Sequence, residues 1–435
     1  GYDYVIATAE DLAKFRNDVN NGTTNMRAIQ IADIDLANYT DWLPIGTYYD
    51  PFSGEYHGNG YAIRNLTIKG SYLGSQTDVA GLFGYVDGAF LTGIHLRDAN
   101  VTIKAGSSPA RCVGTLLGEA NGITQITTCS ATGKIGTVAC RYDDTAVSAT
   151  GGLIGSGAPS FISFCYADVN IGEDGIYAPK LYSNVHYSCT VGGFIGNILT
   201  TSSYPGCNIA ACRSLGNIKL ERIDAICSHT INVGGFVGSD TPSGISNIGG
   251  SYSMGNITIS FVNVPNSSNT PRVLNTGGFI GVANSLFQFR SCYSYTSITL
   301  TYDVAKNAGA PIGDLYFGGF AGNVGSCTPK NCYGNGSVIP GSTEFPDIHS
   351  YEFSPKVDTF TDCFSNSSLT SAGKTVQEIV SPSTPFGLPY KYHIIEYDPS
   401  TNSYFTEGKK EIQLGTDRIW KKTPANTAYP EINYD

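Results

Sequence analysis

The sequence predicts an all-β protein, a parallel β-helix (β-solenoid) of about eight to nine coils with an N-terminal helix/strand cap and a C-terminal β cap. The prediction depends on a glycine-flanked apolar pair that occurs seven times, at spacings of 34 to 43 residues. Periods of about 20–50 residues indicate that one supersecondary unit stacks on the next. The copies of this glycine motif end at Gly84, Gly118, Gly155, Gly196, Gly238, Gly281 and Gly322.

Composition supports the same class and excludes some partners. The 435 residues include 52 Gly and 28 Tyr, and only 14% are charged, which favours turns and strands over helices. The formal charge is −10 and no basic run occurs, so nucleic acid and anionic membrane surfaces are not expected as partners. No stretch reaches the roughly 18 apolar residues of a membrane span, and no signal peptide follows Gly1.

Residues 1–57 are expected to form an N-terminal cap and lead-in. A short strand at 5–6 precedes Thr8 and Asp11, whose spacing is a variant of the capping box and predicts a helix through about Val19. The apolar positions of this helix lie on one face and are Leu12, Phe15 and Val19. A solenoid needs a cover over its first open coil, and this helix is the expected cover.

Alternation over 29–36 predicts a strand in the cap. Ile29, Ile31 and Ile34 are expected to be partly buried in it, and the phase slip between the last two is interpreted as a bulge.

Residues 58–369 are expected to form the solenoid, and residues 370–435 a cap of a few antiparallel strands. Each repeat has three parts: a glycine motif (192–196), a strand with a small residue (126–133) and an alternating run (256–261). Three short strands with two tight corners would complete one coil. Glycine fits where φ is positive or where neighbouring coils approach closely.

A propeller is the alternative, since about 41 residues also suit a four-stranded blade. The solenoid is favoured because the variation in repeat length collects at the third corner, in excursions at 136–149, 172–189, 219–231, 258–274 and 300–315. Such a face is often the binding face of a solenoid. The array would be roughly 40 Å long at ~4.8 Å per coil.

A row of small residues is expected along the second strands, at Cys129, Cys165, Cys212, Ser251, Cys292, Cys332 and Cys363. A metal row or disulfides between coils are conceivable, because stacked coils bring Cα atoms within disulfide range. Burial of a small apolar side chain explains the row better, because Ser251 occupies the same position and no zinc-type spacing occurs.

Six further cysteines lie outside this row. Cys207 with Cys212, and Cys327 with Cys332, share a spacing that would allow a bridge across the first corner. Cys140, Cys189 and Cys227 lie on the excursions and could pair in an oxidising compartment. The sixth is Cys112.

The sequence predicts no catalytic, cofactor-binding or metal-ligating residue. The histidines form no ligand pair, and the metalloprotease, nucleophile-elbow and P-loop motifs do not occur. Two carboxylate pairs, Asp33/Asp35 and Asp143/Asp144, are interpreted as solvated loop acids. The residues with binding potential are surface tyrosines, since aromatic faces suit sugars and proteins alike. The candidates are Tyr48, Tyr49, Tyr182, Tyr187, Tyr293, Tyr295, Tyr302 and Tyr316.

The glycine motifs, followed by Cys-Tyr strands that end in Gly-Asn, resemble the GLUG-motif repeat family of bacterial surface proteins over roughly 28–435. The segments 42–46 and 52–68 resemble that family's lead-in, and 419–420 and 429–430 its closing segment. The resemblance implies a secreted or surface-anchored, adhesin-like protein, and it carries over no catalytic residue. The long excursions and extra cysteines depart from the family pattern.

We therefore expect a non-enzymatic bacterial protein, extracellular or associated with the outer membrane, and monomeric. One decorated face would bind a glycan or a host or partner protein, without a cofactor and with contacts on the excursions. The alternatives are a polysaccharide-active β-helix lyase or hydrolase and a spacer for another domain.

Overall fold

The computed structural model describes residues 1–75, 77–103, 111–136, 138–139, 148–173, 176–177, 187–200, 206–220, 229–241, 244, 246–261, 273–284, 287–302, 315–325, 327–330, 332–334, 338–340, 348–351, 364–365, 395–398, 403–406, 420–421 and 431–432. Most of each predicted excursion lies outside these residues, as do Cys140, Cys227, Cys363 and the Asp143/Asp144 pair.

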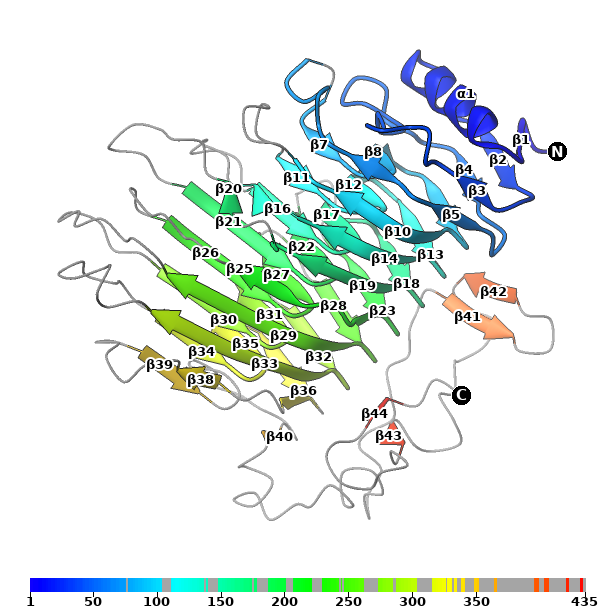
Figure 1. Ribbon diagram of the computed structural model, residues 1–435. Helices are drawn as coiled ribbons and strands as arrows, with labels where there is room; N and C mark the ends of the chain where they lie inside the picture. Colours follow the sequence, from blue (N-terminus) through cyan, green and yellow to red (C-terminus); the bar gives the residue numbers. More distant parts are fainter. Residues whose placement is uncertain are drawn as a thin grey trace.

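Four parallel sheets run along the molecule, and the chain passes through them in a fixed order (Figure 1). Sheet A contains, in spatial order, β1 (Tyr4–Ile6), β2 (Arg27–Gln30), β4 (Glu55–His57), β9 (Phe90–Thr92), β13 (Gln125–Thr127), β18 (Phe161–Ser163), β23 (Asn208–Ala210), β28 (Ser246–Gly249), β32 (Phe287–Arg290) and β36 (Thr328–Lys330).

Sheet B is the largest. Its main path is β3 (Ile34–Asp35), β5 (Ala62–Arg64), β10 (His95–Val101), β14 (Ser130–Ile135), β19 (Tyr166–Ile171), β24 (Arg213–Ser214), β29 (Tyr252–Phe261), β33 (Tyr293–Tyr302), β37 (Tyr333–Gly334) and β40 (Phe364–Ser365). Beside this path, β6 (Thr67–Ile68) pairs with β10, β25 (Ile218–Leu220) with β19 and β29, and β38 (Val338–Pro340) with β33.

Sheets C and D meet at the glycine motifs. Sheet C contains β8 (Phe83–Asp87), β12 (Leu117–Asn121), β17 (Ile154–Gly157), β22 (Ile195–Ile198), β27 (Val237–Asp240), β31 (Ile280–Ala283) and β35 (Ala321–Val324). Sheet D contains β7 (Val79–Ala80), β11 (Cys112–Val113), β16 (Ser148–Gly151), β21 (Tyr187–Gly192), β26 (His229–Gly234), β30 (Val273–Gly277), β34 (Leu315–Gly318) and β39 (Ile348–Tyr351).

Three short pairs complete the described strands. A parallel pair joins β15 (Val138–Ala139) and β20 (Ile176–Tyr177). Two antiparallel pairs lie within 370–435, the predicted C-terminal cap: β41 (Ile395–Asp398) with β42 (Ser403–Thr406), and β43 (Trp420–Lys421) with β44 (Glu431–Ile432).

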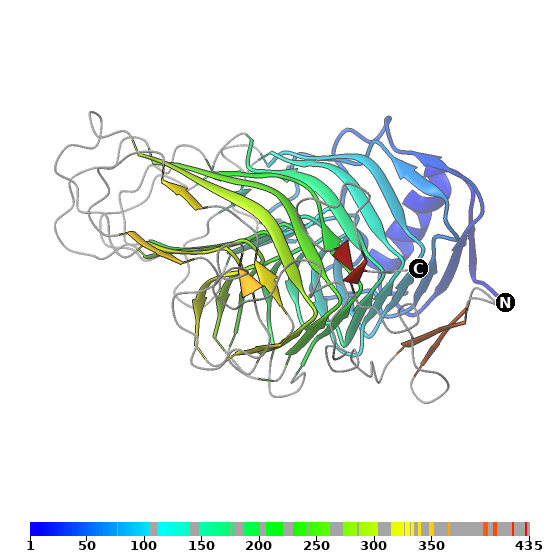
Figure 2. The same ribbon diagram turned by 90° about the horizontal axis from the view of Figure 1, so that it is seen from below.

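The parallel β-solenoid is confirmed, and two details of the prediction are corrected. Each coil runs through sheets D, C, A and B, so it has strands in four sheets where the repeat pattern predicted three strands. The described strands complete seven coils, one for each strand of sheet C, fewer than the predicted eight to nine. Figure 2 shows the coils following one another in sequence order, from the blue N-terminal end to the yellow strands.

The N-terminal cap has the predicted helix, α1 (Ala9–Asn20). The Thr8 side chain accepts a hydrogen bond from the Asp11 N–H, and the Asp11 carboxylate accepts one from the Thr8 N–H, which completes the capping box. Leu12, Phe15 and Val19 are fully buried, and the Phe15 ring packs edge-on against Phe52. The helix therefore covers the open end of the core (Figure 1).

The segment 29–36 is not one bulged strand. It divides into β2 of sheet A and β3 of sheet B, so the slip in alternation marks a corner between two sheets. Ile34 is buried as expected, whereas 47% of Ile31 is exposed because it lies at that corner. Alternation alone does not distinguish a bulge from a corner, since both shift the phase by one residue.

The glycine motif forms the tight corner between sheets D and C. A side chain at Gly193 would overlap the carbonyl oxygen of Gly235 in the next coil and the Ser214 hydroxyl of sheet B. The Ser253 hydroxyl donates to the Gly278 carbonyl at 2.7 Å. The strand facing the motif therefore needs small residues, and this explains the second part of the repeat.

Inside the same corner, phenylalanines stack from coil to coil. The rings of Phe194, Phe236, Phe279 and Phe320 lie 4.7, 4.8 and 4.9 Å apart with interplanar angles of 2°, 9° and 5°. The spacing matches the ~4.8 Å rise between parallel strands, so the ladder follows directly from the coil repeat. It forms the centre of the core in the last four motif-bearing coils.

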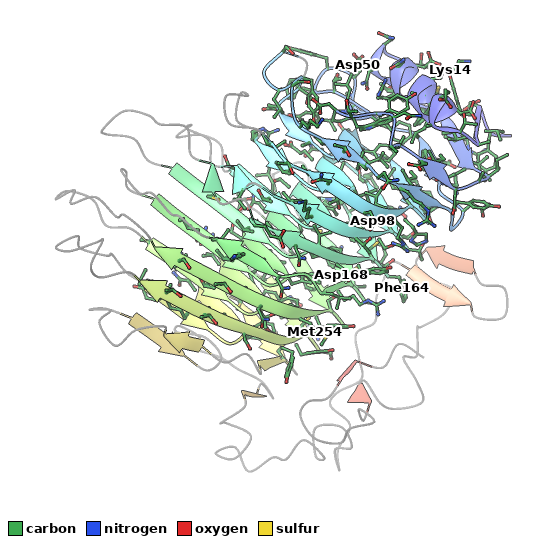
Figure 3. All side chains as sticks on the ribbon, in the orientation of Figure 1. Lys14, Asp50, Asp98, Phe164, Asp168 and Met254 are labelled. Atoms are coloured by element: carbon green, nitrogen blue, oxygen red, sulfur yellow. The ribbon has the colours of Figure 1, made fainter. Side chains whose placement is uncertain are left out.

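The corner between sheets A and B uses a single left-handed residue. Its φ values lie between 51° and 54° at Thr128, Phe164, Ala211, Gly250 and Ser291. The N–H of Phe164 donates to the Ala210 carbonyl of the next coil at 3.1 Å, so the bend is also hydrogen-bonded between coils. Phe164 is labelled at this edge in Figure 3. Only one of these five residues is glycine, and Gly93, with a φ of 63°, holds the equivalent position in the first complete coil.

Ala211→Gly is therefore expected to raise the free energy of unfolding by on the order of 0.5 kcal/mol. The left-handed conformation costs an L-residue roughly 1–2 kcal/mol, and the greater entropy of glycine in the unfolded chain offsets part of the gain. Chemical denaturation measures the change. Ala210→Gly, at the adjacent strand position, is the control and is expected to be destabilising. A loss of stability in both variants would contradict the inference that the left-handed backbone of Ala211 is strained.

Asp41 fixes the turn that joins the lead-in to the first coil. Its carboxylate accepts hydrogen bonds from the N–H groups of Lys69, Gly70 and Ser71 at 2.7, 3.1 and 2.9 Å. Burial raises the pKa of this carboxyl, but the hydrogen bonds from Ser71, Lys69 and Gly70 lower it more, so its pKa lies below the usual 3.8.

Because the folded-state pKa is lowered, the ionised Asp41 stabilises the fold above the unfolded-state pKa of ~3.9, and this contribution is lost as the pH falls through the folded-state value. Asp41→Asn is expected to lower the melting temperature at pH 7, and the gap to the unmodified protein should narrow as the pH falls below ~3.9 toward the folded-state pKa. Asp50→Asn is the matched control for the charge change. A gap that stays constant down to pH 3 would contradict the role of the carboxylate.

The cysteine row is confirmed as a buried column within the described coils. The Cys129 N–H donates to the Cys165 sulfur at 3.3 Å, and the Cys212 N–H donates to the Ser251 hydroxyl at 3.1 Å. The described cysteines are all buried thiols and none is in a disulfide, so the Cys207–Cys212 and Cys327–Cys332 bridges are not formed. No group of metal-ligating side chains occurs among the described residues.

Candidate ligand-binding face

The outer face of sheet B lines up side chains of the same kind from coil to coil. Strand β19 shows the alternation: Ala167, Val169 and Ile171 are buried in the core, while Asp168 is exposed and Tyr166 half-buried. Register between β14, β19, β24, β29 and β33 then stacks the outward residues into rows along the solenoid. Figure 3 shows Asp98, Asp168 and Met254 following one another along this face.

The first row is aromatic and cationic. The Arg213 guanidinium lies 4.9 Å from the centre of the Tyr166 ring, which is within cation–π range. In the next coils, Tyr252 and Tyr293 stack with their centres 4.7 Å apart. Tyr293 is only 1% exposed and Tyr252 9%, so Tyr166 and Arg213 are the accessible members of this row.

A second row on the same face is made of amides. The Asn217 N–H donates to the Asn170 side-chain oxygen at 3.0 Å, and the Asn256 N–H donates to the Asn217 side-chain oxygen at 2.8 Å. Each amide oxygen thus bonds to the backbone of the next coil, which orients the side chain. The NH₂ group of the exposed Asn217 can then donate to a ligand hydroxyl.

The sequence contains a signal for these residues beyond the tyrosines themselves. Each outward residue of the first row directly follows a member of the cysteine row, as in Cys165-Tyr166 and Cys212-Arg213. Because side chains alternate across a strand, a buried cysteine implies an outward neighbour.

The eight candidate tyrosines do not form one site. Tyr48 and Tyr49 are 68% and 86% exposed, on a turn near helix α1. Tyr295 lies on the sheet B face and is half-buried, whereas the burial of Tyr293 makes that candidate wrong as a surface contact. Tyr316 is half-buried in sheet D. Tyr182 and the side chains of Tyr187 and Tyr302 lie outside the described residues.

A second candidate site is an ionic cluster in the first two coils, where carboxylates from adjacent coils meet. Arg111 forms a salt bridge with Asp78, at 3.2 Å between Nε and Oδ2, and another with Glu119. Arg111 also donates to the Tyr85 hydroxyl at 2.8 Å, and that hydroxyl donates to Asp78. One guanidinium thus pairs with both carboxylates, and the Glu119 side chain is only 8% exposed.

The electrostatics of this cluster favour a structural role. Burial lowers the pKa of Arg111, but the Glu119 carboxylate and the Tyr85 hydroxyl raise it by more, so the pKa lies above its usual value and the guanidinium stays charged. Burial and the Glu119 carboxylate both raise the pKa of the Cys112 thiol. Since the nucleophile is the thiolate, Cys112 is not activated for covalent chemistry. The cluster ties the first two coils together through paired charges.

The predicted loop acids Asp33 and Asp35 serve as local hydrogen-bond acceptors. Asp33 accepts from the Ala62 N–H at 2.8 Å and pairs with Arg64 at 3.3 Å. Asp35 accepts from the Asn65 side chain at 2.8 Å. The Ala62 N–H lowers the pKa of Asp33, and the Asn65 amide lowers that of Asp35, so both carboxyls are ionised at neutral pH.

Comparisons with known proteins add a likeness in fold. No family model matches the chain, and no curated protein matches it. It is similar to the crystal structure of a candidate immunoglobulin A1 protease from Bacteroides ovatus, at 17% identity and a TM-score of 0.51, covering 99% of this chain and 92% of that one. An IgA1 protease structure follows at 15% identity and a TM-score of 0.43, covering 73% of this chain and 21% of that one.

At 17% identity, the first of these likenesses shows that the solenoid architecture is shared and nothing finer. Among the described residues, no helix has the length and apolar character that crossing a membrane requires.

Proposed function

We propose that this chain is a non-enzymatic β-solenoid, exported to the bacterial cell surface or beyond, that binds a glycan along the outer face of sheet B. The observation that carries the proposal is the Tyr166–Arg213 pair on the same face as the oriented amide of Asn217, whose side-chain oxygen accepts from the Asn256 N–H. An aromatic ring packs against a sugar ring, and fixed amide and guanidinium donors satisfy its hydroxyls. The resemblance to GLUG-motif repeats supports the surface location.

The protease named for the structural neighbours is the alternative that calls for a direct test. The carboxylates that meet between adjacent coils, Asp78 and Glu119, are already paired with Arg111, so this cluster offers no free acid or base. Incubation of the purified chain with immunoglobulin A1 and with polysaccharides, followed by electrophoresis and reducing-sugar assays, is expected to show no cleavage. Turnover of either substrate would replace binding with catalysis as the function.

A glycan array tests the binding face. Tyr166→Ala is expected to weaken binding about tenfold, since removing an aromatic ring on which a nucleic-acid base stacks costs about 1–3 kcal/mol and a sugar ring offers a similar flat contact. Tyr49→Ala is the matched control, because this ring is more exposed and lies on the turn near helix α1. Loss of binding in Tyr49→Ala alone would show that the glycan binds at that turn and not on sheet B. Capture of a protein ligand, with no glycan bound, would contradict the proposal.

A further inference from the structure

We propose that a second site, on the turn 47–50 beside helix α1, binds a small quaternary ammonium compound such as choline. This site goes beyond the proposed function and is separate from the glycan face. The turn carries the two most exposed aromatic residues in the described part of the chain, since Tyr48 is 68% and Tyr49 86% exposed. Figure 3 places the neighbouring Asp50 at the cap end of the solenoid, away from Asp168 on sheet B.

The two exposed rings are held in place by their neighbours. The Tyr48 ring packs edge-to-face against the buried Tyr85 of β8, with centroids 5.7 Å apart, and against Tyr49 at 5.4 Å. The turn is closed by two hydrogen bonds, from the Thr47 N–H to the Asp50 carbonyl at 3.0 Å and from the Asp50 N–H to the Thr47 hydroxyl at 3.1 Å. A ligand would therefore find the rings already positioned, which lowers the cost of binding.

The angle between the rings favours a rounded cation over a flat sugar ring. Tyr48 and Tyr49 are inclined by 87°, so they form two walls of a corner and not one continuous platform. A trimethylammonium group presents a charged surface of methyl groups in every direction and can contact both walls. The negative faces of aromatic rings attract such a cation, and aromatic cages are the sites at which proteins recognise choline and methylated lysine.

The charged groups around this corner are mostly acidic. Asp50 follows the rings in the turn, and none of the salt bridges between described residues involves it. Beyond Tyr85 lies the ionic cluster, in which the two carboxylates of Asp78 and Glu119 outnumber the single guanidinium of Arg111. The potential at the rings therefore favours a cation over an anion.

The C-terminal end of helix α1 adds to this negative potential. The Asn20 side chain joins that end to the residues before the turn, because it donates to the Pro44 carbonyl at 2.9 Å and accepts from the Gly46 N–H at 2.7 Å. A Cβ at Gly22, just beyond the helix, would lie 3.7 Å from the Asp50 carboxylate. The last turn of the helix has no basic residue, so a bound cation would compensate both the carboxylate and the helix end.

Choline and its uncharged isostere 3,3-dimethylbutanol test the charge requirement, because they differ only in a nitrogen or a carbon at the same place. An NMR titration is expected to give at least fivefold tighter binding of choline, which weakens as salt rises from 50 to 500 mM because exposed charges are screened. Equal affinity for the two compounds, or binding of neither, would overturn the site. Tighter binding of phosphocholine, or sedimentation with phosphatidylcholine vesicles, would overturn the choice of a free cation over a lipid headgroup.

Variants of the turn locate the contact. Tyr49→Ala and Asp50→Asn are each expected to weaken choline binding about two- to fivefold, the effect of one exposed cation–π contact, with the circular dichroism spectrum unchanged. Tyr49→Phe keeps the ring and should restore most of the affinity. Asp168→Asn removes an exposed carboxylate of sheet B and is the matched control for net charge. An equal loss in Asp168→Asn would mean that net charge governs binding, which would overturn the site.

The same variants separate this site from the glycan face. Tyr166→Ala is expected to bind choline normally, and Tyr49→Ala is expected to bind uncharged glycans normally, since the two sites share no residue. Loss of choline binding in Tyr166→Ala with Tyr49→Ala unaffected would place the cation on sheet B and overturn the site at the turn. Absence of binding to every glycan, with choline still bound in a Tyr49-dependent way, would overturn the proposed function and leave the ammonium site intact.

Discussion

Phe236→Ala is expected to lower the free energy of unfolding by about 3–5 kcal/mol, the range for removing a fully buried aromatic side chain. The Phe236 ring is stacked on both sides, by Phe194 at 4.7 Å and by Phe279 at 4.8 Å. Truncation would leave a cavity in the middle of the ladder, and the rings above and below are held by their own backbones. Urea denaturation followed by circular dichroism measures the loss.

Phe236→Leu is the matched control, because earlier coils carry Leu82, Leu116 and Leu153 at the same motif position. We expect a loss of less than about 1.5 kcal/mol for this substitution, since most of the volume remains. Equal losses for the Ala and Leu variants would show that the aromatic stack itself, and not the filling of the core, stabilises this corner.

Gly235→Ala is expected to cost about 3 kcal/mol or more and to reduce soluble expression. A Cβ at this position would overlap the carbonyl oxygen of Gly278 and lie 2.8 Å from the Thr296 hydroxyl. The overlapped atom belongs to the backbone of the next coil, so relief requires the two coils to move apart. Overpacking of a well-packed core costs about 1–3 kcal/mol, and a backbone clash lies at the upper end.

Gly325→Ala controls for the loss of glycine itself. Its Cβ would have the Asn284 carbonyl oxygen as nearest atom, at 3.2 Å, and we expect a change within about 1 kcal/mol. The second coil carries Thr115 at the motif position equivalent to Gly235, and its hydroxyl donates to the Gly152 carbonyl at 2.5 Å. An unchanged stability for Gly235→Ala would mean that the interior coils can accommodate a side chain as the second coil does.

The elements that the sequence predicted correctly share a local cause. The Thr8–Asp11 capping box needs only four residues, and the glycine motif needs only the close approach of identical neighbours in the next coil. The cysteine row followed from the same repeat, because equivalent residues of stacked coils occupy equivalent positions. Local spacing or the repeat period was enough for each of these.

Other features depended on which residues face one another across a coil or between neighbouring coils. The left-handed corner at Ala211 was missed because most residues at this corner are not glycine, and hydrogen bonds between coils hold the strained backbone. The burial of Tyr293 was missed because tyrosine suits both a surface and a packed position. The ionic cluster joins residues on separate strands, which no spacing rule connects.

The sequence by itself determined that this protein is a capped parallel β-solenoid, because a repeat of 34 to 43 residues with glycine at a fixed place can bury its apolar pair only by stacking. The tertiary structure decided that each coil has strands in four sheets, which carboxylates are already paired, and which side chains share the outer face of sheet B. The physical reason is that pairing register between coils, not order along the chain, sets the neighbours of Tyr166 and Arg213.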